Sequence, residues 1–468
     1  MSDLVPQHSP ASPAILDADQ GEEITYRQLL DRVTQAADCL RRELGRGLVF
    51  HVAKDTADAI VLYLACLEAG CPLVLLEPGS GDRLEPLLQA YDPDAVFLPV
   101  ETAVPASLRP GASLPTPTYR MAIRRTERAA RPLHPDLALL LTTSGSTGSP
   151  KLVRLTRNNL LANARAIASY LGIQSGERSI QSLPMHYSYG MSLVNSHLVA
   201  GATVVLTRHS FMRPEFWKAF DQTGCTSFAG VPYMYETLHR LRFDPKQHAG
   251  LRTMTQAGGG LRRDLIQSFH ERSSATGCRF FVMYGQTEAA PRISYVPHER
   301  LAEKIGSIGI PIPNGRLSLA PLEDSDQQEL IYSGPNVMMG YAQSTEDLAA
   351  GDELSGRLRT GDLATVDNEG FFTLTGRLKR FAKLFGRRIS LEELEKELEM
   401  RYPIHAAATE REGQLLIFVA AREKVDLEGV GRDLAKRLNV PPKCVKVEPI
   451  AAIPLTSSGK TDYKALST

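Results

Sequence analysis

Helical and extended hydrophobic patterns alternate along most of the chain. After Thr25, which is expected to be an N-cap, apolar side chains recur at helical spacing, and a second helical segment covers Ile60–Gly70. Segments of both kinds follow at Pro72–Leu76, Asp94–Pro99, Asn158–Leu171, Ala202–Thr207 and Pro214–Thr223. This alternation predicts an α/β fold in which helices cover parallel-rich sheets.

Two stretches depart from this pattern. Thr102–Pro135 is rich in Pro, Ala and Arg and is predicted to consist mainly of loops. From Gly376 onward, short alternating segments surround two charged helices, Ser390–Arg401 and Leu427–Leu438, and one strand at Leu415–Ala420. The second stretch predicts a small α+β domain of ordinary domain size. A chain of 468 residues also exceeds the size at which a single core keeps growing, so at least two domains are expected.

Composition narrows the class of protein. Lys and Arg together number 53, as do Asp and Glu, so nothing in the charge favours nucleic acid as a partner. The six cysteines are scattered without a C-x-x-C pair, which indicates buried apolar residues rather than a disulfide frame or zinc site. The longest apolar run, Ile60–Leu67, is too short to span a bilayer, and no signal peptide precedes it. A cytoplasmic protein without stable membrane insertion is expected.

The loop after the apolar strand Leu137–Leu141 has the chemistry of a phosphate-binding segment. It consists of Thr142, Thr143, Ser144, Gly145, Ser146, Thr147, Gly148, Ser149, Pro150 and Lys151. Hydroxyls donate to phosphate oxygens, glycines let backbone N–H groups approach an anion, and the lysine adds positive charge. The P-loop of kinases needs Gly-Lys-Ser/Thr at this point, and the sequence lacks it. A flexible linker is the other alternative, but linkers rarely follow a buried strand directly.

Two further motifs carry candidate nucleotide-binding groups. Tyr284-Gly285-Gln286-Thr287-Glu288 follows the apolar strand Phe280–Met283, and strand ends present ligand-binding groups in open α/β sheets. A tyrosine can stack on adenine, a threonine can bind phosphate, and a glutamate can hold Mg²⁺. Upstream, the run Gly258, Gly259 and Gly260 would let a flat base lie on the backbone.

Two later motifs are ambiguous in isolation. Asp362 ends the motif Arg359-Thr360-Gly361-Asp362, and considered alone it would be interpreted as a turn or capping residue. The motif Gly376-Arg377-Leu378-Lys379 follows it in the sequence. Lys460, in Pro454-Leu455-Thr456-Ser457-Ser458-Gly459-Lys460, reads alone as a solvated charge.

Taken in order, these motifs resemble those of the AMP-forming adenylating enzymes, which include acyl-CoA synthetases, amino-acid adenylation domains and luciferases. The resemblance runs from about Thr25 to Leu466 and is greatest to acyl-CoA synthetase-like acyl-AMP ligases. It implies an N-terminal ATP- and acid-binding domain of residues 1–378 and a mobile C-terminal domain of residues 379–468. It also implies ATP-dependent conversion of a carboxylic acid to an acyl-adenylate, followed by transfer to the pantetheine thiol of CoA or of an acyl or peptidyl carrier protein.

The resemblance also assigns roles to residues. Thr142, Ser144, Thr147 and Lys151 would hold the β- and γ-phosphates, Thr287 the α-phosphate and Glu288 the Mg²⁺. Asp362 and Arg377 would bind the ribose, Lys379 would be the hinge, and Gly386 would leave room for the pantetheine arm. Lys460 would be the catalytic lysine that reaches the acyl carboxylate and the α-phosphate.

The implied acid pocket includes His186 as a gate, together with Tyr187, Ala229, Gly230 and Val231. Amino-acid-activating members place an aspartate near this segment, but no Asp or Glu lies between Glu177 and Glu215. Because a buried ammonium without a carboxylate is costly, an aliphatic or fatty acid without an α-amino group is expected. An amino-acid adenylation enzyme that loads a carrier protein, an acyl-AMP ligase, and an inactive binding module of the same fold remain alternatives. The protein is expected to be a monomer or a homodimer.

Overall fold

The structure is a computed structural model that describes residues 4–5, 9–79, 81–125, 131–142, 151–322, 325–378, 380–384, 387–411, 414–421, 425–438, 440–456, 461–463 and 465–466. Its contacts divide the chain into two compact units. The first comprises Met1–Ile305, Gly309–Arg316 and Tyr332–Leu358, and the second comprises Gly306–Ile308, Leu317–Ile331 and Arg359–Thr468.

A nine-stranded sheet in the first unit has the order β16-β15-β14-β13-β12-β10-β11-β1-β2. Its strands are β1 (Pro13–Asp17), β2 (Glu22–Thr25), β10 (Arg178–Ile180), β11 (Thr203–Leu206), β12 (Ser227–Gly230), β13 (Thr253–Gln256), β14 (Arg279–Gly285), β15 (Arg292–Tyr295) and β16 (Ile310–Pro311). The strands from β14 to β1 pair in parallel, while β2, β15 and β16 add antiparallel edges. The predicted parallel-rich sheet is confirmed.

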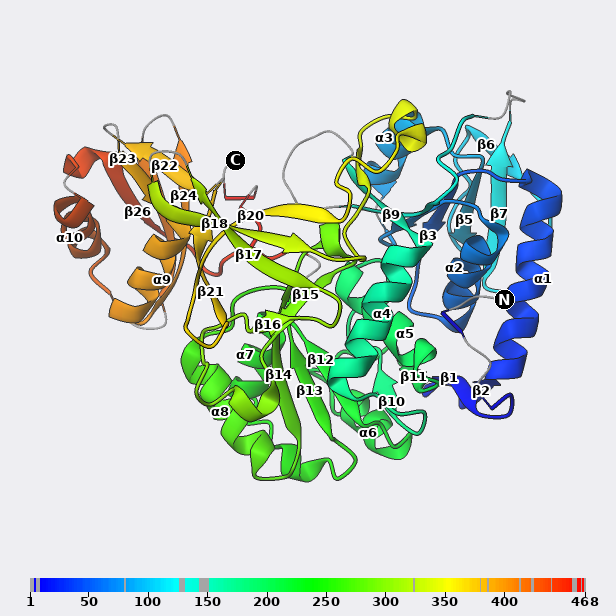
Figure 1. The fold of residues 1–468 in the computed structure, drawn as a ribbon, viewed down its shortest axis with the longest axis horizontal. Coiled ribbons are helices and arrows are strands. Elements are labelled where there is room, and N and C mark those ends of the chain that lie inside the picture. The colour runs from blue at the N-terminus through cyan, green and yellow to red at the C-terminus, as the bar shows by residue number, and fades with distance from the viewer. Residues whose placement is uncertain are drawn as a thin grey trace. The chain divides into compact units, whose positions relative to one another are not determined.

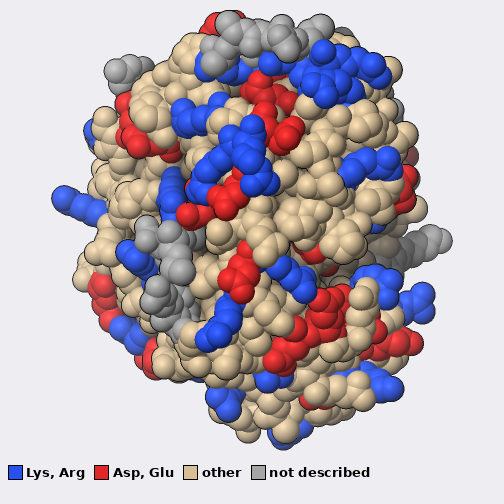
Figure 2. Space-filling view, turned by 90° about the vertical axis from the view of Figure 1, so that its right-hand side faces the viewer, with Lys and Arg blue, Asp and Glu red and all other residues tan. Residues whose placement is uncertain are grey.

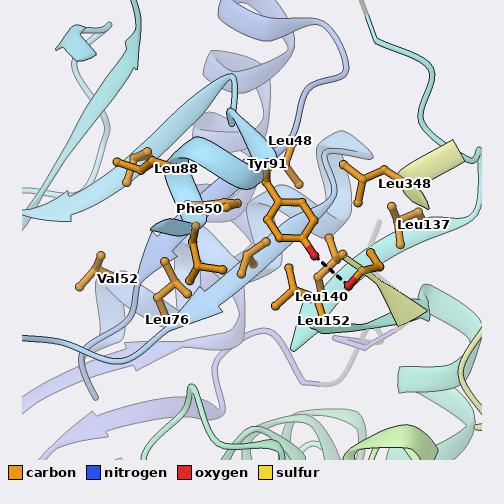
Figure 3. Packing of buried hydrophobic residues seen from close by; sticks show 14 of the residues in the cluster. Leu48, Phe50, Val52, Leu76, Leu88, Tyr91, Leu137, Leu140, Leu152 and Leu348 are labelled. Carbon is orange, nitrogen blue, oxygen red and sulfur yellow. Dashed lines mark hydrogen bonds between the residues drawn. The ribbon is translucent and has the colours of Figure 1, made fainter. Parts of the chain in front are cut away.

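An eight-stranded sheet forms the other layer of strands in this unit, in the order β19-β9-β8-β4-β3-β5-β7-β6. Its strands are β3 (Val49–Val52), β4 (Leu73–Leu76), β5 (Ala95–Pro99), β6 (Leu108–Pro110), β7 (Tyr119–Arg124), β8 (Leu137–Thr142), β9 (Leu152–Thr156) and β19 (Gly340–Ala342). Figure 3 shows the apolar cluster on this sheet, where Phe50, Leu140 and Leu152 surround Tyr91. The Tyr91 hydroxyl donates to the carbonyl of Ala342 at 2.8 Å, which ties the edge strand β19 to this core.

Eight helices of the first unit are described. They are α1 (Tyr26–Leu44), α2 (Ala57–Ala69), α3 (Gly81–Tyr91), α4 (Arg157–Leu171), α5 (Ser188–Val199), α6 (Pro214–Gln222), α7 (Pro232–Arg240) and α8 (Arg263–Ser274). Thr25 caps α1, as predicted, and the structure shows that it forms a capping box with Gln28. Figure 1 shows α4 beside α5, and α7 and α8 beside β12 and β14. Helices therefore cover the parallel strands whose ends carry the candidate site.

The second unit is smaller and mixes strands with two helices. Most of a four-stranded sheet, β17 (Arg316–Leu322), β18 (Ser325–Ser333), β20 (Arg357–Val366) and β21 (Phe372–Arg377), belongs to it. The rest comprises β22 (Phe381–Leu384), β23 (Arg387–Ser390), α9 (Leu391–Arg401), β24 (Ile404–Arg411), β25 (Gln414–Ala421), α10 (Leu427–Leu438) and β26 (Val445–Pro449). The two charged helices and the strand predicted there are confirmed.

The loop prediction for residues 102–135 is wrong in part, because this stretch contains β6 and β7. Tyr119 and Met121 are buried on β7, Arg120 between them is exposed, and the strand pairs with β5. The alternation of apolar and polar residues along β7 is only a few residues long and lies between segments rich in proline and arginine. For this reason the sequence pattern did not predict a strand there.

The surface and the cysteines agree with the composition. On the face drawn in Figure 2, basic and acidic side chains lie interspersed among uncharged ones. All six cysteines are buried and unpaired, as predicted. Within the described ranges, no helix is long and apolar enough to cross a bilayer.

Candidate active site

Three neighbouring parallel strands end at one edge of the nine-stranded sheet. Gly230 ends β12, Gln256 ends β13 and Gly285 ends β14, with Gly230 in register with Gln256 and Gln256 with Val282. The carboxyl ends of parallel strands form the edge at which open α/β sheets bind ligands. Predicted site segments follow all three ends: Val231, Gly258–Gly260 and Gln286–Glu288.

Gly258 lies where two predicted pocket residues meet. Its φ is +87°, and a Cβ at this position would lie 2.7 Å from the hydroxyl oxygen of Tyr187 and 3.1 Å from Cγ1 of Val231. Both the backbone conformation and the close approach require glycine. Gly259 and Gly260 are exposed. The structure therefore brings Gly258, but not the whole glycine run, against the predicted acid pocket.

Thr287 lies beside the same pocket. It begins the short 3₁₀ helix Thr287–Ala289, and its Oγ1 lies 3.3 Å from Oγ of Ser188, the first residue of α5. Because Ser188 directly follows Tyr187, this contact joins the predicted α-phosphate ligand to the acid pocket.

Glu288 and Lys151 share one aromatic partner, Tyr341 of β19. The Tyr341 hydroxyl donates to Oε1 of Glu288 at 2.8 Å, and Nζ of Lys151 lies 3.4 Å from the centroid of the Tyr341 ring. Burial and the neighbouring charge of Glu288 raise the pKa of Tyr341, so its hydroxyl stays protonated and able to donate. The predicted metal ligand and the predicted phosphate-binding lysine thus meet across a residue that sequence reasoning did not single out.

A fully buried arginine holds β19 in place. Arg154 of β9 donates through Nε to the carbonyl of Tyr341 at 3.1 Å and through Nη1 to the carbonyl of Ala350 at 2.5 Å. Its Nη2 pairs with Oε1 of Glu353 at 2.6 Å. These bonds satisfy a charge that would otherwise be costly to bury, and they fix the backbone of Tyr341.

The remaining predicted residues of the first unit lie close to these groups. Nε2 of Gln286 donates to the hydroxyl of Tyr284 at 3.1 Å, so the two predicted nucleotide-binding side chains contact each other. Ala229 and Gly230 are buried, and the carbonyl of Ala229 accepts from Ser182 at 2.5 Å.

His186, the predicted gate, is half-buried beside this pocket. Burial lowers the pKa of its imidazole below the usual value, while the charge of Glu77 and a backbone hydrogen bond to Ala53 act in the opposite direction. The ring is therefore neutral at neutral pH, which suits an uncharged wall for an acid pocket.

A carboxyl group missed in the sequence also lies at this segment. The amide of Met185 donates to Oδ1 of Asp55 at 2.8 Å, and burial raises the pKa of Asp55 to about 6. Asp55 precedes Met185 by 130 residues, so inspection of the 178–214 segment alone could not find it. The sequence between Glu177 and Glu215 contains no acidic residue, but in the folded chain the carboxyl group of Asp55 contacts this segment.

Tyr189 and Arg292 form a second contact that the sequence did not indicate. The guanidinium of the buried Arg292 lies 4.6 Å from the ring of Tyr189, whose hydroxyl contacts Thr255. Tyr187 packs edge-on against Tyr189 at 6.4 Å between ring centroids. Tyr187 thus packs against Tyr189, whose ring makes a buried cation–π contact with Arg292.

The second unit holds the two predicted ribose-binding residues. Asp362 of β20 and Arg377 of β21 are cross-strand neighbours, and Nε of Arg377 donates to Oδ1 of Asp362 at 2.7 Å. The Asp362 side chain is almost fully buried, whereas that of Arg377 is half exposed. The carboxylate is therefore held in one orientation by a cation that remains accessible.

Several predicted residues lie outside the described residues: Thr143, Ser144, Gly145, Ser146, Thr147, Gly148, Lys379, Gly386 and Lys460. The two ends of the predicted phosphate-binding loop are described. Thr142 is exposed at the end of β8, and Lys151 directly precedes β9, which pairs with β8.

Magnesium requires few protein ligands when phosphates complete its coordination. In the part of the chain that the structure describes, no group of three or more His, Cys, Asp or Glu side chains could hold a metal ion. Glu288, a half-buried carboxylate oriented by Tyr341, fits a site in which one carboxylate and nucleotide phosphates share the ion.

Comparison with known proteins identifies the family. The family described as AMP-binding enzyme matches residues 4–342. The chain belongs to the AMP-binding enzyme family. A relative in this family, a feruloyl-CoA synthase from an Amycolatopsis species, is 31% identical over 392 residues, which are 81% of this chain and 78% of the relative.

Two further comparisons cover nearly the whole chain. A medium-chain fatty-acid–CoA ligase of Escherichia coli strain K12 is 26% identical and covers 96% of this chain and 86% of its own. The structure of O-succinylbenzoate coenzyme A synthetase from Bacillus subtilis with ATP and a magnesium ion aligns with a TM-score of 0.77 at 22% identity, over 100% of this chain and 99% of that chain. The predicted fold class and the assignment to AMP-forming acid–thiol ligases are confirmed.

Proposed function

We propose that this AMP-binding enzyme activates a carboxylic acid with ATP to an acyl-adenylate, releases pyrophosphate, and transfers the acyl group to the thiol of CoA. One observation carries the proposal: contacts run without a break from Lys151 through Tyr341, Glu288, Thr287 and Ser188 to Tyr187. This path joins a cation, a hard carboxylate and a hydroxyl to Tyr187, which packs beside Gly258 among the residues predicted to bind the acid. Such an order suits a triphosphate at one end and an acid at the other.

The first step needs positive charge and donors placed in advance. A carboxylate oxygen attacks the α-phosphorus of ATP, the bond to the β-phosphate breaks, and pyrophosphate leaves. Negative charge gathers on the phosphoryl oxygens, so preorganised donors supply most of the catalysis. Lys151, Thr142, Ser144 and Thr147 would hold the leaving phosphates, and Thr287 would bind the α-phosphate. Glu288 would hold Mg²⁺, which neutralises phosphate charge when bound.

Residues of the second unit complete the proposal. Asp362 would accept hydrogen bonds from the ribose hydroxyls, since Arg377 holds its carboxylate in one orientation. Lys460 would stabilise the charge that develops in adenylate formation. A rotation about Lys379 would then replace Lys460 with the segment around Gly386, which would admit the pantetheine arm.

The acid is proposed to be aliphatic or fatty, without an α-amino group. No Asp or Glu lies between Glu177 and Glu215 to pair with an α-ammonium. The buried Ala229, Gly230 and Val231 do not by themselves open space for the acid, since a Cβ at Gly230 would already lie 2.9 Å from the Tyr235 ring. The E. coli relative named as a medium-chain fatty-acid–CoA ligase supports this class, whereas the relative named as a feruloyl-CoA synthase supports an aryl acid.

One observation favours a second candidate, an amino-acid adenylation enzyme that loads a carrier protein. Asp55 supplies a carboxyl group next to Met185, where an α-ammonium could pair with it. However, Oδ1 of Asp55 already accepts a backbone amide, and burial disfavours its charged form. The aliphatic acid therefore remains the first proposal.

Pyrophosphate exchange with a panel of acids tests these alternatives. The panel contains octanoate, ferulate, a dicarboxylate and a mixture of α-amino acids. Exchange with octanoate but not with amino acids supports the proposal, while exchange with amino acids alone overturns it. An absence of exchange with every acid would revive the inactive binding module.

The acceptor is tested with the acid identified in that panel. Thioester formation is measured with CoA and with a carrier protein bearing phosphopantetheine. We expect CoA to be acylated, because the relatives are named as CoA ligases; acylation of the carrier alone would identify an acyl-AMP ligase. A cytoplasmic location is part of the proposal and is checked by fractionation of cells that express the full chain.

A further inference from the structure

The segment next to Lys460 has a fixed base. Leu455 and Thr461 form an antiparallel bridge, and the amide of Asp462 donates to the carbonyl of Pro454 at 2.8 Å. Residues 456–460 therefore connect two backbone positions that are hydrogen-bonded to each other. Lys460 is the last residue of this connection and directly precedes Thr461.

Tyr463, three residues after Lys460, ties this base to the rest of the second unit. Its hydroxyl accepts a hydrogen bond from Nη1 of Arg380 at 2.8 Å and donates one to Oε2 of Glu395 at 3.1 Å. The guanidinium of Arg380 also lies 3.8 Å from the centroid of the Tyr463 ring. A single tyrosine thus uses both its hydroxyl and its ring on the same partner.

Glu395 of α9 makes this contact rigid. The residue is only 8% exposed, and its Oε1 accepts from Nη2 of Arg380 at 2.7 Å and from the amide of Ala408 at 2.6 Å. Nη2 of Arg380 also donates to the carbonyl of Ala408 at 3.1 Å. A buried ion pair whose remaining donors and acceptors are satisfied has one well-defined geometry, and loss of one partner is costly.

Arg380 directly follows Lys379, the proposed hinge. We propose that Tyr463 is a positioning residue: its contacts with Arg380 and Glu395 hold Thr461–Tyr463, the described residues that directly follow the catalytic lysine, next to the residue that follows the proposed hinge. The inference rests on the proposed role of Lys460.

The consequence is specific to one half-reaction. Adenylate formation needs Lys460 in place, whereas transfer of the acyl group from adenylate to CoA does not use it. Misplacement of a catalytic group by about 1 Å can cost roughly 100-fold in rate. Loss of the Tyr463 hydroxyl is therefore expected to slow adenylation and to spare thioester formation.

The test compares Tyr463→Phe with Tyr402→Phe in the full chain. The Tyr402 hydroxyl donates to Oδ2 of Asp433 at 3.4 Å in the same unit, without contact to Arg380 or Glu395, and so serves as the matched control. Pyrophosphate exchange reports adenylation, and synthetic acyl-adenylate with CoA reports the second step. Arg380→Lys is a second variant, since lysine keeps the charge but cannot bond Glu395, Tyr463 and Ala408 together.

We expect Tyr463→Phe and Arg380→Lys to lower kcat of adenylation about 10- to 100-fold, with KM for ATP and acid unchanged. Thioester formation by both variants should stay near that of Tyr402→Phe. The melting temperature of Tyr463→Phe should also stay near that of the control, whereas Arg380→Lys should lower it, because lysine cannot keep all the bonds of the buried pair. Unchanged adenylation, or equal loss in both steps, would overturn the inference. Lys460→Ala, measured in parallel, distinguishes failure of the positioning role from failure of the proposed catalytic role. If Lys460→Ala lowers the adenylation rate but Tyr463→Phe does not, only the positioning role of Tyr463 is wrong. If Lys460→Ala leaves the adenylation rate unchanged, the proposed role of Lys460 is wrong as well.

Discussion

The hydroxyl of Tyr341 donates to Oε1 of Glu288 at 2.8 Å, and the same ring lies under the ammonium of Lys151. One side chain on the edge strand β19 therefore orients two groups proposed to act on the triphosphate and its magnesium ion. Arg154 fixes the backbone of Tyr341, and the bond from Tyr91 to Ala342 fixes the next residue. This arrangement makes Tyr341 a direct target for mutation.

Tyr341→Phe keeps the ring under Lys151 and removes the donor to Glu288. A hydrogen bond to a charged group contributes about 1.5–3 kcal/mol, so pyrophosphate exchange should fall roughly 10-fold or more. The Mg²⁺ concentration for half-maximal rate should rise, while KM for the acid stays unchanged. Tyr91→Phe, which removes a hydroxyl bonded to the same strand, is the control. Equal behaviour of the two variants would show that Tyr341 acts only by holding β19.

Tyr341→Leu removes the ring as well. The cation–π contact with Lys151 contributes about 0.5–2 kcal/mol, so KM for ATP should rise beyond that of Tyr341→Phe. Initial rates at varied ATP measure the difference between the two variants. The same KM in both would argue against a role for the ring.

Gly258→Ala should damage the acid pocket. Its φ of +87° strains any other residue, and the added Cβ would meet the Tyr187 hydroxyl at 2.7 Å. We expect a loss of about 1–3 kcal/mol in the free energy of unfolding and a higher KM for the acid. Gly260→Ala is the matched control, because a Cβ there meets nothing within 4 Å. If the two variants unfold at the same denaturant concentration, the close approach to Tyr187 does not constrain this site.

Asp55→Asn should stabilise the protein in a pH-dependent way. Burial raises the pKa of Asp55 from 3.8 to about 6, so the folded state holds the proton more tightly than the unfolded state. In the wild type, the contribution of Asp55 to the free energy of unfolding is fully present below about pH 4, where the carboxyl is protonated, and is lost as the pH rises through 6. Asparagine does not titrate and can still accept the Met185 amide.

The gain in unfolding free energy of Asp55→Asn is therefore expected to be about 2–3 kcal/mol at pH 8 and only about 1 kcal/mol at pH 4.5. Urea denaturation at the two pH values measures it. A variant less stable than the wild type at pH 8 would show that the charged carboxylate is stabilised by a partner.

Lys460→Ala should abolish adenylate formation and leave transfer from supplied acyl-adenylate to CoA largely intact. The reason is that only the first step gathers charge beside the proposed position of Lys460. Single-turnover measurements of each step separate the two. An equal loss of both steps would contradict the role given to this lysine.

Much of the fold followed from the sequence because its elements carry local signals. The Thr25 cap, and the apolar strands that end at Thr142 and Gly285, were visible from residue types within a few positions. The strand Tyr119–Arg124 was missed because its short alternation lies in a stretch rich in proline and arginine. Tertiary pairing with β5, not local preference, determines that strand.

The candidate site was predictable only where its residues form contiguous motifs. Thr287 and Glu288 belong to such a motif, whereas Tyr341 and Asp55 stand alone in the sequence. Asp55 reaches Met185 across 130 residues, and Tyr463 reaches Arg380 across 83, so only the folded chain shows these partners. Residues that act by orienting others carry no pattern of their own.

The product of ATP cleavage tests the central claim most directly. The full chain is incubated with Mg²⁺, ATP, CoA and a panel of carboxylic acids, and the nucleotides and thioesters are resolved by liquid chromatography and mass spectrometry. The proposed function predicts AMP and pyrophosphate in equal amounts, formed only with a carboxylic acid and accompanied by its CoA thioester. Formation of ADP and phosphate, or an absence of ATP cleavage with every acid, would contradict it.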